Sequence, residues 1–151
     1  MPKKISKDLP LSEITLRRYE KPYKMSRREA MRKLCLSLGL LQPGDSRDVI
    51  VDVLHSIVDS SKRKKMITSD EVQKQVITLR KKNKLNANGI AASNIRRQMK
   101  RLKDLQIIEK IKNEYRITEF ESMENVFEER IKKYHLPQIM SRVKDYCRVA
   151  K

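Results

Sequence analysis

Apolar residues recur at helical spacing over residues 93–105 and give way there to a strand-like pattern. Four of them follow one another at intervals of four, three and three residues and therefore share one side of a helix; they are Ile95, Met99, Leu102 and Leu105. Ser93 stands at the start as a candidate N-cap, because its hydroxyl can accept a bond from a free backbone N–H. The pattern predicts an amphipathic helix whose far side is basic.

A β-hairpin is predicted directly after this helix. Residues 107–111 form a short segment rich in isoleucine, and apolar and polar residues alternate over residues 115–118 as they do in a strand. Asn113 supplies a turn residue between them. The hairpin loop has two or three residues, and only the odd length places Ile111 opposite Ile117, so the register stays open.

Two more helices are predicted upstream. The first begins at Asp45 or Ser46, carries an apolar stripe and closes on the basic run 62–65. The second opens on a capping box, Thr68 with Glu71. The connection that follows, residues 83–92, is longer than the turn of about 3–4 residues typical of a helix-turn-helix.

Both ends of the chain carry further segments. Residues 1–10 form a basic arm, and residues 11–24 suit either a short strand or a helical turn that stops at Pro22. The arm reaches along DNA or packs over its own domain or a partner subunit. Ser26 and Glu29 form a capping box for a helix that ends at Gly39.

Two helices are predicted at the C-terminus, separated by a break at Pro137. The last one carries an apolar stripe at helical spacing, formed by Ile139, Val143, Tyr146 and Cys147. Such a stripe needs a cover. The same helix of a second subunit is the preferred cover, which predicts a homodimer, and packing on the N-terminal helix is the alternative.

These elements predict a mainly α fold with a small β-hairpin. Its centre is a winged helix-turn-helix core over residues 45–120, because a basic helix that runs straight into a basic hairpin is typical of a recognition helix and wing. Residues 1–24 form a basic arm, residues 25–42 an N-terminal helical extension, and residues 121–151 C-terminal helices with a possible role in dimerisation.

Charge narrows the class of partner. The 151 residues include 36 Lys+Arg and 19 Asp+Glu, for a net charge of +17. Nucleic-acid phosphate is the commonest reason for such a surplus, and a lysine-rich solvated surface is the other. Aromatic residues are only 5% with no Trp, which argues against a membrane surface.

The sequence offers no enzyme chemistry. With 3 Gly it has no glycine-rich phosphate loop, and no catalytic triad, metal-ligand cluster, cofactor motif or small-molecule site is evident. Cys35 and Cys147 are expected to be free, buried thiols on apolar helix faces. Without a signal peptide or an apolar run of membrane-spanning length, the expected location is the cytoplasm, in association with the nucleoid.

The run SNIRRQMKRLKDLQIIEKIKNEYRITEF resembles the recognition helix and wing of archaeal and bacterial winged-helix transcriptional regulators. Their common form is a polar helix start, R-x-x-x-x-L-x-x-L, a two-residue apolar step and a wing that ends in Tyr-Arg-aliphatic-Thr. The resemblance covers roughly residues 46–120. It implies that Gly89 and Ile90 are the turn glycine and core aliphatic residue of the family.

A binding function follows as the expectation. Eight residues are the candidate DNA contacts: Ser93, Asn94, Arg96, Arg97, Lys100, Arg101, Lys112 and Arg116. Arg97 and Lys100 are expected to point most directly into the major groove, and Asn94 and Arg96 to read bases. Arg101 is expected to reach phosphates, and the wing residues Lys112 and Arg116 to follow the adjacent backbone or minor groove.

Three functions fit these features. The preferred one is a dimeric, sequence-specific transcriptional regulator that binds double-stranded DNA. The second is a less specific nucleoid, replication or mobile-element DNA-binding protein. The third is a winged helix turned to RNA or protein contact.

Overall fold

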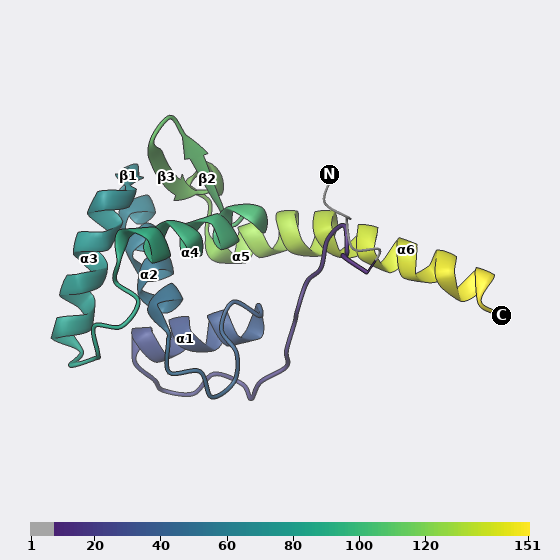
Figure 1. Ribbon diagram of the computed structural model, residues 1–151, viewed down its shortest axis with the longest axis horizontal. Helices are drawn as coiled ribbons and strands as arrows, with labels where there is room; N and C mark the ends of the chain where they lie inside the picture. Colours follow the sequence, from purple (N-terminus) through teal and green to yellow (C-terminus); the bar gives the residue numbers. More distant parts are fainter. Residues whose placement is uncertain (1–7) are drawn as a thin grey trace, which may run out of the picture.

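A computed structural model describes residues 8–151, so the first seven residues of the predicted basic arm lie outside the described part of the chain. The fold is mainly helical with a small antiparallel sheet, as predicted (Figure 1). In chain order the elements are α1 (Arg27–Ser37), α2 (Val49–Lys62), β1 (Ile67–Thr68), α3 (Ser69–Lys82), α4 (Ala92–Asp104), β2 (Ile108–Ile111), β3 (Glu114–Ile117), η1 (Thr118–Phe120), α5 (Met123–Val126), η2 (Phe127–His135) and α6 (Leu136–Val149).

Helix α2 is the centre of the molecule. It packs against α1, α3, α4 and β3, and it is buried on almost every side. Seven of its buried residues are apolar and belong to the hydrophobic core cluster, and four are polar: Asp52, Ser56, Ser60 and Ser61. Met31, Cys35 and Leu36 of α1 belong to the same core cluster, so α1 shares one hydrophobic core with the elements that follow it.

The sheet has the strand order β1-β3-β2, with antiparallel pairing throughout. Ile108 pairs with Ile117 and Ile111 with Glu114, so the hairpin has a two-residue loop and Ile111 is 45% exposed. This settles the open register in favour of the even loop. The outer strand β1, whose Ile67 pairs with Tyr115, was not predicted, because two residues are too few to show a strand pattern.

The structure confirms two of the predicted N-cap residues and contradicts the predictions for two other helices. Both hydrogen bonds of the capping box at α3 are present: the Thr68 hydroxyl accepts from the backbone N–H of Glu71, and the Glu71 carboxylate accepts from the backbone N–H of Thr68. Ser26 caps α1 by accepting a hydrogen bond from the backbone N–H of Glu29. Helix α2 begins at Val49, so the caps predicted at residues 45 and 46 are wrong.

The predicted cap of α4 at Ser93 is also wrong. Helix α4 begins at Ala92, and Ala91 takes the N-cap position without a side-chain bond. Ser93 is an exposed residue of the first turn. The helix start is stabilised instead by Asn94, whose Nδ2 donates to the carbonyl oxygen of Gly89 over 2.8 Å.

The segment before α1 is neither a strand nor a helical turn within residues 9–25. It lies against the end of α1, where the backbone N–H of Arg17 donates to the carbonyl oxygen of Ser37 over 2.9 Å. The guanidinium of Arg17 donates to the carbonyl oxygens of Leu36 and Leu41 over 2.8 and 3.1 Å. These three hydrogen bonds attach the segment to the end of α1 and to the loop that follows it.

The C-terminal helix runs without interruption from α5 through η2 into α6, so the predicted break at Pro137 is wrong (Figure 1). His135 and Leu136 have ordinary helical backbone angles. A proline lacks one N–H donor and crowds the carbonyl one turn earlier. Residues 127–135, which precede the proline, are wound as a wider π-helix.

Helix α6 extends away from α1–α4 and the sheet and has no buried residue, and residues 9–12 lie beside it (Figure 1). Its predicted stripe is therefore not covered by the N-terminal helix; Val143 is 56% and Tyr146 70% exposed. Within residues 8–151, no helix combines the length and apolar character that crossing a bilayer requires.

The two cysteines are free thiols, and Cys35 is buried as predicted. The predicted burial of Cys147 is wrong, because α6 has no buried residue and leaves this thiol exposed. Burial raises the pKa of Cys35 to about 12, so the reactive thiolate is scarce at neutral pH. In a Cys147→Ser variant, we expect the remaining thiol to react with Ellman's reagent only after denaturant is added. A Cys35→Ala variant keeps only Cys147 and should react in native buffer; rapid native reaction of Cys35 would contradict its burial.

Candidate nucleic-acid interface

Helix α4 presents a basic face to solvent. Its other face is held in the core by Ile95, Met99 and Leu102, all of which are buried. Four basic side chains of the helix are exposed: Arg96, Arg97, Lys100 and Lys103. The apolar stripe therefore determines which side of the helix can meet a partner.

The outermost charges of α4 are only weakly engaged. Lys100 Nζ lies 2.9 Å from a carboxylate oxygen of Asp104, with side chains 73% and 61% exposed. An exposed pair one helical turn apart is worth at most about 1 kcal/mol, so Lys100 can exchange this partner for a phosphate. Arg97 forms no ion pair within the described part of the chain.

Asn94 and Arg101 are turned toward the protein rather than away from it. Besides its bond to Gly89, Asn94 accepts a hydrogen bond from Gln98 Nε2 over 3.1 Å. Arg101 Nη1 donates to Gln98 Oε1 over 2.8 Å. A base-reading role for Asn94 stays a prediction, and it requires these bonds to break on binding.

The hairpin follows α4 directly and rises beside it (Figure 1). Lys112 lies exposed in its two-residue loop. Arg116 is already engaged: its Nη2 lies 2.6 Å from Glu109 Oε1, and its guanidinium lies 4.6 Å from the ring centroid of Phe120. Of the two predicted wing contacts, Lys112 is therefore the more available.

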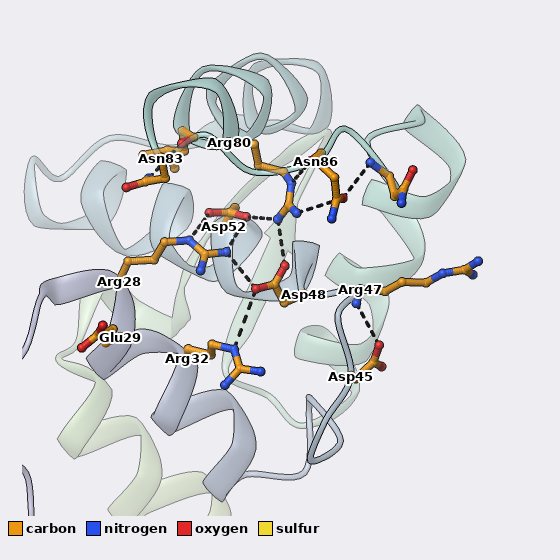
Figure 2. A network of polar contacts seen from close by, with 12 residues as sticks. Arg28, Glu29, Arg32, Asp45, Arg47, Asp48, Asp52, Arg80, Asn83 and Asn86 are labelled. Atoms are coloured by element: carbon orange, nitrogen blue, oxygen red, sulfur yellow. Dashed lines mark hydrogen bonds and ion pairs between the residues drawn. The ribbon is translucent and has the colours of Figure 1, made fainter.

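A buried ion network lies behind α4 and joins α1, α2 and α3 (Figure 2). Arg80 Nη1 of α3 lies 3.0 Å from Asp48 and 2.7 Å from Asp52, and its side chain is only 3% exposed. Arg28 of α1 reaches the same two carboxylates over 3.1 and 3.2 Å. Asp52 thus meets two guanidinium groups and Asp48 three, because Arg32 Nε also lies 3.8 Å from Asp48. These contacts offset the cost of removing the charges from water.

The network also holds the connection between α3 and α4. Arg80 Nε donates to the carbonyl oxygen of Asn86 over 2.7 Å, and Arg80 Nη2 donates to its Oδ1 over 3.2 Å (Figure 2). Gln73 Nε2 donates to the carbonyl oxygen of Ile90 over 2.8 Å. This long connection is therefore an ordered loop that sets where α4 begins.

Gly89 occupies a position in this loop that suits only glycine. Its φ is +86°, and a Cβ there would lie 3.0 Å from Asn94 Nδ2 and 3.1 Å from Val49 Cγ2. The left-handed backbone and the close neighbours both disfavour a side chain. The expectation that Gly89 is a turn glycine and that Ile90 packs on the core agrees with the structure.

Burial raises the pKa of the Asp48 carboxyl, but hydrogen bonds from Arg80 and Arg28 outweigh it, so the pKa lies below its ordinary value. The network was not predicted from the sequence. A signal was present: Asp48 and Asp52 are four residues apart and stand among the apolar residues Val49, Ile50, Val51, Val53 and Leu54. Buried carboxylates at such positions call for cationic partners.

Among residues 8–151, no group of three or more His, Cys, Asp or Glu side chains is placed to hold a metal ion. Comparisons with protein-family models, with curated proteins and with solved structures found no match to this chain. The site is therefore interpreted from its own geometry.

Proposed function

We propose that this protein is a winged helix-turn-helix protein that binds double-stranded DNA, with α4 in the major groove and the β2–β3 hairpin as the wing. The observation that carries the proposal is the single basic face of α4, which is held outward by a buried apolar stripe. The helices α2, α3 and α4 with a three-stranded antiparallel sheet are compatible with a winged-helix shape. A major groove about 12 Å wide admits such a helix.

The charge distribution supports a phosphate partner. The chain carries a net charge of +17, and the exposed cations of α4 and the hairpin loop lie outside the buried ion network. Each phosphate that they neutralise releases condensed counterions, which favours binding at low salt. Affinity is therefore expected to fall steeply as salt rises.

Fluorescence anisotropy with a random DNA duplex, titrated at several salt concentrations, tests this proposal. We expect log affinity to fall linearly with log salt, by about 0.9 for each phosphate contacted. A structured RNA is the comparison ligand. Failure to bind duplex at low salt would overturn the proposal, and tight binding to the RNA alone would favour RNA contact as the function.

We propose further that α6 pairs with the same helix of a second copy, which would make the protein a dimeric regulator with paired half-sites on DNA. The support is the apolar stripe of α6, on which Val143 is 56% and Tyr146 70% exposed even with residues 9–12 beside them. Glutamate at both Val143 and Tyr146 should halve the molar mass measured by light scattering. The matched variant, glutamate at the exposed residues Gln138 and Ser141, adds the same two negative charges away from Val143 and Tyr146 and should remain dimeric. An unchanged mass for the first variant would refute the pairing.

A less sequence-specific DNA-binding role is the second candidate, and one observation favours it. Asn94 is the residue best suited to read adenine, but its side-chain amide already forms hydrogen bonds with Gly89 and Gln98. With fewer free groups for bases, phosphate contacts would dominate the binding energy. Selection from a random duplex library would decide: a palindromic consensus indicates a regulator, and no enrichment indicates a nucleoid-type protein.

A further inference from the structure

A second cationic surface lies beside α4, where the loop between α1 and α2 approaches the helix. A pocket there is lined by arginines from both elements, Arg47 from the loop and Arg97 and Arg101 from α4. These three residues are called the arginine pocket below. Leu41 and Val49 form part of its apolar wall.

The three guanidinium groups lack carboxylate partners. None of them forms an ion pair within residues 8–151, whereas Arg28, Arg32 and Arg80 nearby are all paired with aspartates. Figure 2 shows the Arg47 side chain directed away from Asp48 and Asp52. The pocket lining holds three arginines and one acid, Asp45, so it keeps a surplus of positive charge that favours an anion.

One acid also lines the pocket, and its role is local. Asp45 Oδ1 accepts a hydrogen bond from the backbone N–H of Arg47 over 2.8 Å. The carboxylate therefore orders the loop without neutralising the guanidinium. Gln42, which accepts a 2.7 Å hydrogen bond from Arg17, anchors the other side of the loop. Arg47 thus projects from an ordered backbone, which lowers the entropy cost of binding.

We infer that the arginine pocket binds a phosphodiester group of the nucleic-acid backbone, with Arg47 as a contact outside the recognition helix and wing. Guanidinium groups bind phosphate oxygens in pairs of parallel hydrogen bonds, which suits an anion placed between two elements. Arg97 lines the pocket and also lies on the exposed face of α4, so a strand that follows α4 passes the pocket. The inference rests on the proposed DNA-binding function and adds a strand-backbone clamp to it.

Salt titration of an Arg47→Ala variant tests the clamp. Loss of one phosphate contact should reduce the slope of log affinity against log salt by about 0.9, which is about an eightfold loss at 0.1 M salt. The same factor should apply to every duplex sequence, because a phosphate contact carries no base information. The matched control is Arg18→Ala, an exposed arginine that does not line the pocket and should leave the slope unchanged.

The outcomes separate the clamp from the wider proposal. If the wild-type protein binds duplex and Arg47→Ala keeps its slope, the clamp is refuted and DNA binding stands. If the wild-type protein does not bind duplex, both are refuted. Calorimetry with inorganic pyrophosphate covers the other source of phosphate: micromolar binding that Arg47→Ala abolishes, with an unchanged DNA slope, would assign the pocket to a small phosphorylated molecule and overturn the clamp.

Discussion

Arg80→Met should lower the free energy of unfolding by about 3–5 kcal/mol, because removing one partner of a buried ion pair leaves uncompensated charge. The variant keeps most of the aliphatic stem and removes the guanidinium that lies 3.0 Å from Asp48 and 2.7 Å from Asp52. It also removes both hydrogen bonds to Asn86. Urea denaturation followed by circular dichroism measures the loss.

Lys81→Met is the matched control, since Lys81 is the exposed neighbour of Arg80 on α3. A surface change of this kind should alter stability by about 0.5 kcal/mol or less. Equal stability of the two variants would mean that the network contributes nothing beyond a hydrophobic side chain.

Acid supplies a second readout of the same network. The folded-state pKa of Asp48 is lowered, so its contribution to stability is present above the ordinary carboxyl pKa and is lost as pH falls through the folded value. The wild-type protein should therefore lose stability in that acidic range. Arg80→Met should show a smaller loss, because one of the two groups that lower the Asp48 pKa is gone.

Arg97→Ala combined with Lys100→Ala should weaken duplex binding by about tenfold or more without unfolding the protein. Both side chains are exposed on the side of α4 opposite its buried stripe. If both side chains meet phosphate, their removal should weaken binding by roughly sixtyfold at 0.1 M salt. Anisotropy with the random duplex measures the affinity, and thermal melting by circular dichroism confirms folding.

The control for the Arg97→Ala, Lys100→Ala variant removes two positive charges from another part of the surface. Arg18 and Lys24 are exposed in the segment before α1, and alanine at both also lowers the net charge by two. The control should lose less affinity than the α4 variant. Equal losses would mean that net charge alone governs binding, and an unchanged α4 variant would remove the helix from the interface.

These tests concern two parts of one arrangement. The exposed face of α4 is proposed to meet the partner, while Arg80 holds the loop from which α4 starts. A destabilised loop would move the first turn of α4 and with it the start of the proposed interface. Stability and affinity should therefore be measured on every variant.

Much of the local structure was determined by the sequence alone. The helices, the capping box at Thr68 and the exposed side of α4 follow from spacing and short-range hydrogen bonds, which act between residues three or four apart. The hairpin followed from a change of period after residue 105. These features depend on neighbours in the chain, so one sequence is enough to predict them.

Only the tertiary structure decided the long-range features. In the observed hairpin register, the backbone N–H of Ile117 donates a hydrogen bond to Ser61 Oγ over 2.9 Å. Arg80 binds Asp48 and Asp52, which lie 32 and 28 positions away in the chain. No local pattern specifies such partners, because burial and charge pairing depend on which elements the fold brings together. The same holds for the arginine pocket, since Arg47 and Arg97 share a surface only after α4 packs on α2.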